Sequence, residues 1–392
     1  MSTIINARSP YFIKYDNSGT GSAGNAGDIA YAEIAIFIYS GENPADQPSD
    51  PTYEITKEVN GSDLFVVVEI SELIRDYLQT EYYNEAIDAV WVDIVTQTYD
   101  SGDREKQETT DTYLAIDGFG YFPEGSNPRT STDPTNTNGY TPMVLQTNMC
   151  VPFVRGRDIK IPVFSEAEPD ITTTIPLGVW NYVDDFWENA DVNWNSTAVD
   201  LTITDSDDSA DKIQYVIISS DNAVTGETIT FTSTVGNAQT QTITVFEVCE
   251  PRYEAFRGIF YNKFGALQTF WFPKKSIVKT DAKSEEYKAI DINYSNATTN
   301  FYNTAKHNKK RFDVIAKQMI TLNTGLIDEC LNDPIEQLLM AEQIWIEDAA
   351  LSTFPVIIRS NSLTRKTGVN NKAETNHTIE FEFAYDTIQN VR

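Results

Sequence analysis

Histidine and cysteine are scarce in this chain of 392 residues, which holds two histidines and three cysteines. These side chains supply the bases, nucleophiles and soft metal ligands that most enzymes use. The polar surroundings of His307 and His377 predict two surface imidazoles, so we expect no Ser-His-Asp or Cys-His pair. Cys150, Cys249 and Cys330 are odd in number and far apart, which predicts buried thiols rather than a disulfide framework. We therefore expect a protein that is not an enzyme and that needs no cofactor and no metal.

Basic residues are scarce in the first two thirds of the chain, where residues 1–250 hold 41 acidic and 11 basic side chains. Residues 251–392 hold 17 acidic and 18 basic side chains, so almost all of the net charge of −29 lies in the first part. Nucleic-acid binding needs clustered lysine and arginine, and the only short run is Lys309, Lys310 and Arg311. We expect no nucleic-acid partner, and we expect the balanced C-terminal part to pack against protein.

Long apolar runs are absent as well. No stretch approaches the roughly 18–20 apolar residues that are needed to span a bilayer, and the segment from Met1 to Asp16 has no apolar core of secretory length. We therefore expect synthesis in the cytoplasm and no insertion into a membrane.

Aromatic residues, by contrast, are abundant at 12%, with 20 tyrosines and 20 phenylalanines. Together with frequent threonine, asparagine and aspartate they favour strands joined by polar turns. Alternating and apolar runs predict strands over residues 29–39, 52–59, 63–70, 89–98, 112–116, 159–164, 201–204, 213–219, 227–234 and 240–248. A short helix is expected from Ser71, with that residue as its N-cap. The predicted class is mainly β, with tandem β-sandwich domains of the immunoglobulin or fibronectin type and a few short helices.

Shifts in composition predict four segments. Residues 1–125 form an N-terminal sandwich with an inserted helix, and residues 126–160 form a linker or surface loop rich in proline, glycine, asparagine and threonine. Residues 161–250 form an acidic sandwich. Residues 251–392 form an α+β domain that we expect to make the assembly contacts.

The C-terminal segment has recognisable turn and cap signals. Residues 256–272 predict a hairpin with Gly265 at its bend. Asp333, Pro334 and Glu336 predict a helix start in which Asp333 is the cap. Three further strands are expected over residues 344–347, 355–359 and 378–385.

One stretch of this segment is a candidate interface, and it comprises Phe270, Trp271, Phe272, Lys274 and Lys275. A strand that buries Phe270 and Phe272 on one face points Trp271 to the other. Trp271 is then either a core residue of a second layer or an interface anchor. The two lysines could meet the acidic part of another subunit.

The acidic middle of the chain offers rival functions. Trp180, Trp187 and Trp194 are interleaved with carboxylates, which is a pattern that sugar-binding sites use, and core packing is the alternative. Asp184, Asp185 and Glu188 would serve a carboxylate-based hydrolase. A further cluster resembles a calcium loop but lacks the glycine and glutamate of the EF-hand, so a solvated turn is favoured. Its members are Asp205, Asp207, Asp208 and Asp211.

Several motifs resemble virion structural proteins of tailed bacteriophages, of the tail or baseplate type. The matching segments are residues 4–13, 69–77, 117–122, 262–268, 271–272, 274–276, 321–325 and 334–339. The resemblance runs along the whole chain and is weakest in the acidic middle. The motifs are turns and core strands rather than reactive sites.

Membership of this family would imply a ring, hub or baseplate subunit that is synthesised in the host cytoplasm and located in the virion tail. Its expected partners are copies of itself in a ring-like homo-oligomer and other tail or baseplate proteins. Rings arise from contacts between unlike surfaces, and the uneven charge of this chain can supply them. The alternative is a glycan- or receptor-binding module of the virion that uses Trp180, Trp187 and Trp194.

Overall fold

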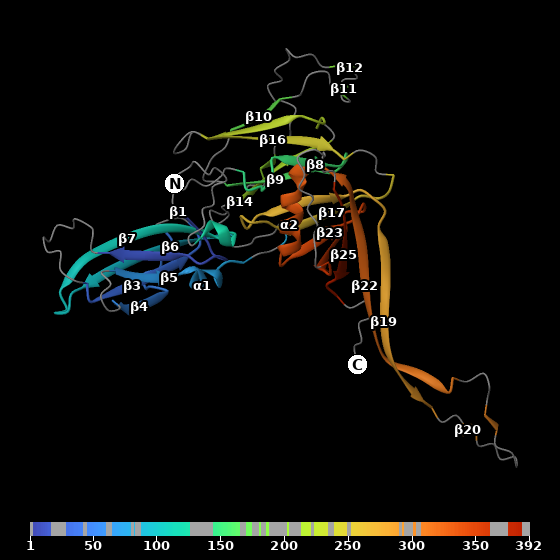
Figure 1. Cartoon of the computed structure of the whole chain (residues 1–392), viewed down its shortest axis with the longest axis horizontal. Coiled ribbons are helices and arrows are strands. Elements are labelled where there is room, and N and C mark those ends of the chain that lie inside the picture. Colours follow the sequence, from blue (N-terminus) through green and yellow to red (C-terminus); the bar gives the residue numbers. More distant parts are fainter. Residues whose placement is uncertain are drawn as a thin grey trace. The chain divides into compact units, whose positions relative to one another are not determined.

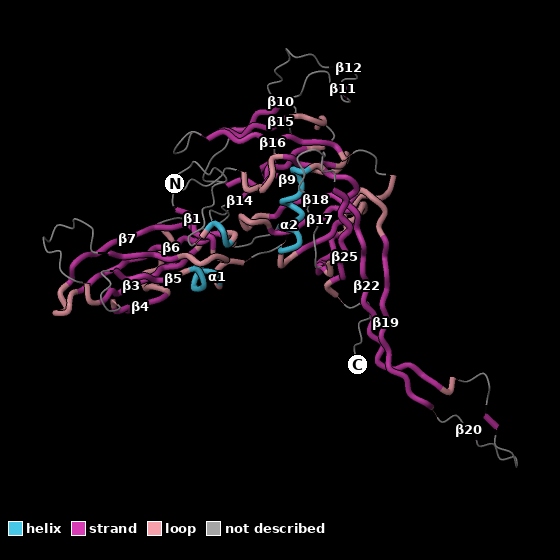
Figure 2. The backbone as a smooth tube through the Cα atoms, viewed as in Figure 1, coloured by secondary structure: helices cyan, strands magenta, loops and turns pink. Residues whose placement is uncertain are grey.

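The computed structural model is mainly β, with 57% of residues in strands and 8% in helices, as the composition predicts. The strands form several sheets (Figures 1 and 2). The residues that the structure describes are 3–16, 29–41, 45–59, 65–79, 82, 88–125, 144–164, 170–174, 180–181, 186–187, 202–203, 213–220, 223–233, 239–248, 252–289, 292–293, 301–302, 307–360 and 375–385.

The chain divides into two compact units. Unit 1 comprises residues 1–248, 260–270 and 330–341, and unit 2 comprises residues 249–259, 271–329 and 342–392. The predicted segments 1–125, 126–160 and 161–250 therefore lie in unit 1 up to Val248. The predicted C-terminal domain contributes two short pieces to unit 1, because its hairpin tip and one helix have most of their contacts there.

Unit 1 begins with a five-stranded sheet in the order β1-β7-β6-β3-β4. Its strands are β1 Thr3–Asn6, β3 Tyr31–Tyr39, β4 Tyr53–Glu58, β6 Ala89–Tyr99 and β7 Glu105–Ile116. β1 is parallel to β7, and the other neighbours are antiparallel. A separate ladder pairs β2 Phe12–Asp16 with β5 Phe65–Glu69, and helix α1 Ser71–Arg75 follows β5.

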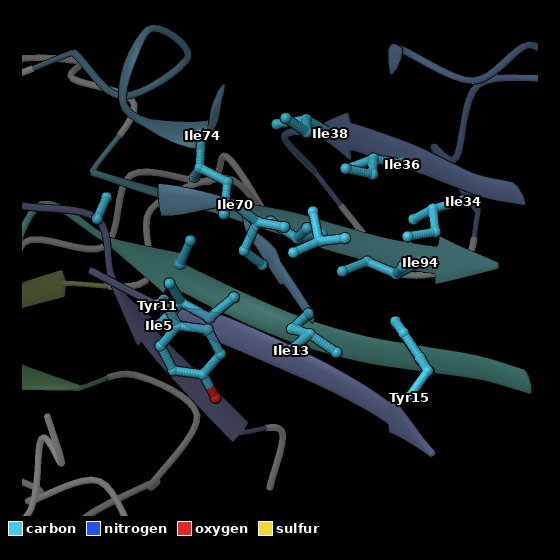
Figure 3. Close-up of a cluster of buried hydrophobic side chains, with 14 of the residues drawn as sticks. Ile5, Tyr11, Ile13, Tyr15, Ile34, Ile36, Ile38, Ile70, Ile74 and Ile94 are labelled. Carbon is cyan, nitrogen blue, oxygen red and sulfur yellow. The ribbon is translucent and has the colours of Figure 1, made fainter. Parts of the chain in front are cut away.

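One face of this sheet is buried by the β2–β5 ladder and by α1 (Figure 3). Every second residue of β3, including Ile34, Ile36 and Ile38, reaches this core because successive side chains of a strand point to opposite faces. Ile13 of β2 and Ile74 of α1 cover them. A fully buried isoleucine contributes about 1.5–3 kcal/mol, so this interior fixes which face of the sheet remains outside.

The second part of unit 1 is a β-sandwich. One sheet has the order β10-β15-β16-β8 and the other has the order β13-β14-β9. The strands are β8 Cys150–Phe153, β9 Ile159–Phe164, β10 Asp170–Thr174, β13 Thr202–Ile203, β14 Ile213–Ile218, β15 Thr228–Ser233 and β16 Gln239–Glu247. Phe153 and Phe231 from the first sheet share one core with Ile161 and Val216 from the second.

The tip of the hairpin at residues 256–272 completes the core of unit 1. Phe264 and Ala266 at this tip are buried in one cluster with Trp91 and Leu114 of the first sheet and with Leu145, which precedes β8. The outer face of the first sheet is therefore covered near these residues. This cluster joins the two β parts of the unit.

The turn of that hairpin is built by Asn262 and Gly265. The Asn262 side-chain oxygen accepts hydrogen bonds from the N–H groups of Phe264 (2.9 Å) and Ala266 (3.2 Å), and its amide donates to the Leu145 carbonyl (2.7 Å). Gly265 has a φ of +72°, a conformation that favours glycine. The predicted glycine at the bend is confirmed.

A seven-stranded sheet has the order β18-β17-β23-β24-β25-β22-β19. The strands are β17 Phe256–Tyr261, β18 Leu267–Phe272, β19 Ile277–Lys288, β22 Lys309–Ile327, β23 Ile344–Glu347, β24 Thr353–Ile358 and β25 Thr375–Phe383. The remaining elements are η1 Phe122–Glu124, β11 Trp180–Asn181, β12 Phe186–Trp187, β20 Ile292–Asn293, β21 Phe301–Tyr302, η3 Glu329–Leu331 and α2 Asn332–Met340.

Both predicted helix caps are wrong. The N-cap positions are Ile70 and Leu331, and neither helix has a side-chain cap hydrogen bond. Ser71 lies inside α1, and its hydroxyl donates to the Glu69 carboxylate at 3.0 Å. Asp333 is the second residue of α2, because a short 3₁₀ turn precedes this helix and shifts its start.

Candidate functional site

The candidate functional site of unit 2 is a long two-stranded arm. β22 pairs with β19 from Lys309 to Thr321, but it pairs with β25 only from Met319 to Ile327. Residues 309–318 therefore have β19 as their one neighbour among the described strands. We call residues 277–288 and 309–318 the arm, and Figures 1 and 2 show its two strands running together away from the other strands of the sheet.

The arm is exposed to solvent over most of its length. Ten of the twelve residues of β19 are exposed and none is buried. The exposed side chains include large apolar ones, with 59% exposure for Ile277, 55% for Val278 and 47% for both Tyr287 and Ile315. β19 ends the strand order of its sheet, so its outer edge has no neighbour among the described strands. Such an edge can pair with another chain.

The root of the arm is tied to the sheet by charged groups. The Glu382 carboxylate of β25 accepts hydrogen bonds from Lys317 Nζ at 2.8 Å and from Arg359 Nε at 2.6 Å. These two cations lower the pKa of Glu382 from 4.5 to about 2, with Arg359 the larger cause. Ala316 and Ile320 of β22, which alternate with Lys317, are buried. The arm therefore starts from a well-packed base.

The outer half of the arm is held by cross-strand side chains. The rings of Tyr287 and Phe312 meet edge to face, with centroids 5.7 Å apart. Arg311 Nε lies 3.9 Å from the Glu286 carboxylate. The last pair in the register, Lys288 opposite Lys309, carries two like charges. Like charges directly opposite each other destabilise an antiparallel pair, so this pair works against the arm when the chain is alone.

The predicted interface stretch lies elsewhere. Phe270, Trp271 and Phe272 are 1%, 5% and 0% exposed, so they are core residues and cannot anchor a partner in this conformation. For Trp271 the alternative of a core residue holds, because β18 is covered on both faces. Lys274 and Lys275 are exposed. Nothing in the structure shows a partner for these two lysines.

The rival sites lie mainly outside the described residues. Trp180 of β11 and Trp187 of β12 stand opposite each other in the register of a two-stranded ladder. Trp194 is outside the described residues. So are the carboxylates Asp184, Asp185 and Glu188 of the alternative hydrolase hypothesis, and the acidic stretch from Asp205 to Asp211 for which a solvated turn was favoured over a calcium loop.

The two histidines differ in their surroundings. His307 is exposed, as predicted. His377 is 7% exposed, so the prediction of a surface imidazole is wrong for this residue. It shares the inward face of β25 with Ile379 and Phe381, and burial lowers its pKa. The cysteines Cys150 and Cys330 are free thiols and partly buried, and Cys249 lies outside the described residues.

Within the described ranges, no group of three or more histidine, cysteine, aspartate or glutamate residues is placed to hold a metal ion. In the same ranges, no helix is both long and apolar enough to cross a lipid bilayer.

Comparison with known proteins finds no matching protein-family model and no matching curated protein. The resemblance to virion proteins therefore stays a prediction from the sequence motifs.

The sequence analysis predicted no strand at residues 277–288 or 309–318, so the arm was missed. The stretch from Lys279 to Lys288 is almost entirely polar, as expected of a strand that is exposed to solvent on both faces. Without a buried face, that stretch has no hydrophobic period to detect.

Proposed function

We propose that this chain is a non-enzymatic structural subunit of a bacteriophage tail, in a ring, hub or baseplate, and that it acts through protein–protein assembly. The motifs that resemble virion structural proteins suggest the particle. The exposed arm is the observation that supports assembly. The tandem sandwiches would be of the immunoglobulin or fibronectin type.

The arm on its own is expected to have little stability. A two-stranded ribbon is marginal in water, because it buries too little apolar surface to offset the ordering of its backbone. The arm nevertheless presents exposed side chains along a free strand edge, and the ring of Tyr287 in its outer half is 47% exposed. Contact with another chain would cover this surface and satisfy the edge.

The experiment compares the native mass of the full chain with that of an arm-shortened variant. Lys283 and Ile315 stand opposite each other in the register, so residues 284–314 can be replaced by an Asn-Gly turn between them. We expect the wild-type chain to form a discrete homo-oligomer and the shortened chain to stay monomeric. Circular dichroism and thermal unfolding show whether the shortened chain is folded. A wild-type chain that is monomeric at every concentration contradicts the proposal.

The second candidate is glycan or receptor binding, which the pairing of Trp180 with Trp187 in one ladder favours. Aromatic rings stack on sugar faces, so neighbouring tryptophans are a plausible platform. A glycan array with the Trp187→Ala variant as control tests it. Binding that the variant loses would support this function, and an array on which the wild-type chain gives no signal would remove it.

A further inference from the structure

We propose that the arm of one copy docks on an acidic sheet face of a second copy. This inference rests on the proposed self-assembly and names the two surfaces that meet. The acidic face is the outer side of the first sheet of unit 1, at the end away from the buried cluster around Trp91. It carries five exposed glutamates: Glu33, Glu54, Glu58, Glu105 and Glu108.

The register places these glutamates on one side of the sheet. Glu58 stands opposite Tyr31, Tyr31 opposite Tyr99, and Tyr99 opposite Glu105. In the next row Glu33 stands opposite Gln97, which stands opposite Glu108. Glu54 stands opposite Ala35. Opposite residues of neighbouring strands share a face, and the intervening residues of β3, such as Ile34, fill the core on the other side.

Among the side chains that the structure describes, the charged ones on this face are all carboxylates. The side chain of Lys106, which follows Glu105 at the bulge of β7, lies outside the described residues. Lys57 alternates to the opposite face, where its ammonium donates to the Val67 carbonyl at 2.6 Å, and Arg104 lies in the turn beyond the end of the face. Five carboxylates side by side on a sheet repel each other, so a cationic partner would lower the free energy of the face.

A flat aromatic pair lies within the face. The rings of Tyr31 and Tyr99 are stacked, with centroids 4.8 Å apart and an interplanar angle of 13°. Desolvation and the carboxylate of Glu33 raise the pKa of both phenols, and Asp103 raises that of Tyr31 further. The face thus combines negative charge with a rigid apolar surface, which is the composition that lysine side chains with long aliphatic stems can cover.

The arm has the complementary charge. Its two strands contain seven basic and four acidic residues, while residues 1–250 carry 41 acidic and 11 basic ones. Three of its basic side chains have ion-pair partners: Lys279 with Asp281, Arg311 with Glu286 and Lys317 with Glu382. The remaining basic side chains have no ion pair with any described residue, and all are exposed: Lys283, Lys288, Lys309 and Lys310.

The pair of Lys288 and Lys309 also supports docking on an acidic partner, independently of the total charge of the arm. These two ammonium groups stand opposite each other in the register, which is unfavourable in the isolated chain. Carboxylates of a second copy placed against them would turn this repulsion into attraction. Lys288 and Lys309 therefore suit the arm side of an interface between two chains.

The contact is between unlike surfaces, so it repeats from copy to copy. Each copy offers one arm and one acidic face, and a heterologous contact of this kind closes into a ring when its rotation allows. Exposed ion pairs act mainly on the rate and specificity of association and weaken with salt. We therefore expect the oligomer to dissociate as the salt concentration rises.

A charge-swap experiment tests the inference. The face variant is Glu33→Lys/Glu108→Lys, and the arm variant is Lys288→Glu/Lys309→Glu. Each variant alone brings like charges together, and we expect its self-association to weaken at least about tenfold. In a mixture, the reversed face meets the reversed arm and the native face meets the native arm. The two variants must alternate in the assembly, so sedimentation of the equimolar mixture should show that self-association returns, with a closed ring when the number of subunits is even.

Two controls separate docking from folding. Asp50→Lys/Glu329→Lys changes the net charge as much as the face variant does, at two exposed sites outside both surfaces, and should leave the oligomer intact. Lys309→Glu alone removes the like-charge pair, so it should stabilise the arm against thermal unfolding. The same variant should weaken association, because the arm loses a positive charge and gains a negative one.

The outcomes distinguish this inference from the proposed function. A wild-type oligomer that the arm-shortened variant loses, but that both charge-reversed variants keep, overturns the acidic face as the docking site and leaves assembly through the arm edge standing. A mixture that does not reassemble also overturns it. A monomeric wild-type chain overturns both proposals.

Discussion

The guanidinium carbon of Arg257 lies 4.8 Å from the ring centroid of Trp271. Arg257 also forms an ion pair with Glu347 at 3.7 Å, and the side chains of this pair are 5% and 9% exposed. A buried cation needs compensation, and here an aromatic face and a carboxylate both supply it. Trp271 therefore stabilises a charge within the sheet of unit 2, in addition to filling space.

Trp271→Ala is expected to lower the free energy of unfolding by about 3–5 kcal/mol, since it leaves a cavity and removes the ring from the cation. Urea denaturation measures the loss. Lys274→Ala, at an exposed neighbour, should change the same quantity by less than about 0.5 kcal/mol. Equal stabilities of the two variants would show that Trp271 is not a core residue.

Gly265→Ala should destabilise unit 1 more than Gly156→Ala does. Both glycines have a positive φ, +72° and +79°, so each substitution adds backbone strain of about 1 kcal/mol. A Cβ at Gly265 would also lie 2.8 Å from the Asp117 backbone, whereas a Cβ at Gly156 meets nothing within 4 Å. We expect a further loss of about 1–3 kcal/mol at Gly265, measured by thermal unfolding. Similar losses for both variants would argue against the close packing of this turn.

Glu382 should make stability depend on pH in the acid range. Its pKa is about 2 in the folded chain and 4.5 ordinarily, so the folded state favours the ionised form. This stabilisation is complete above about pH 5.5 and is lost as the pH falls through 4.5 towards 2. The free energy of unfolding of the wild-type chain should exceed that of Glu382→Gln by about 1–2 kcal/mol at neutral pH. The difference is no larger because solvent screens Lys317 and Arg359, which are half exposed. A difference that stays constant down to pH 2 would contradict this role.

Strands with a buried face were predictable in place and nearly in length. β9 and β23 have the predicted bounds, β14 is one residue shorter at its end, and β16 is shifted by one residue at both ends. These strands carry apolar residues at the period of a half-buried or fully buried strand, so local sequence and tertiary packing agree. Ile335 and Leu338 of α2 are likewise buried, and their spacing of three residues puts them on one side of the helix.

The misses have local causes. His377 sits on the buried side of β25 because the strand begins earlier than its hydrophobic alternation suggests. Ser71 and Asp333 have the composition of helix caps, but the chain enters both helices from a different residue. A cap depends on the backbone direction at the helix start, which the residues around it set only in part.

The amino-acid sequence by itself determined the mainly β class, the glycine at the 262–266 turn and the uneven charge, because alternation, turn chemistry and composition are local properties. Only the tertiary structure decided that Trp271 is buried, that β19 and β22 continue as an exposed arm, and that five glutamates from three strands share one face. These relationships join residues far apart in the chain, and they follow from register and packing rather than from any single segment.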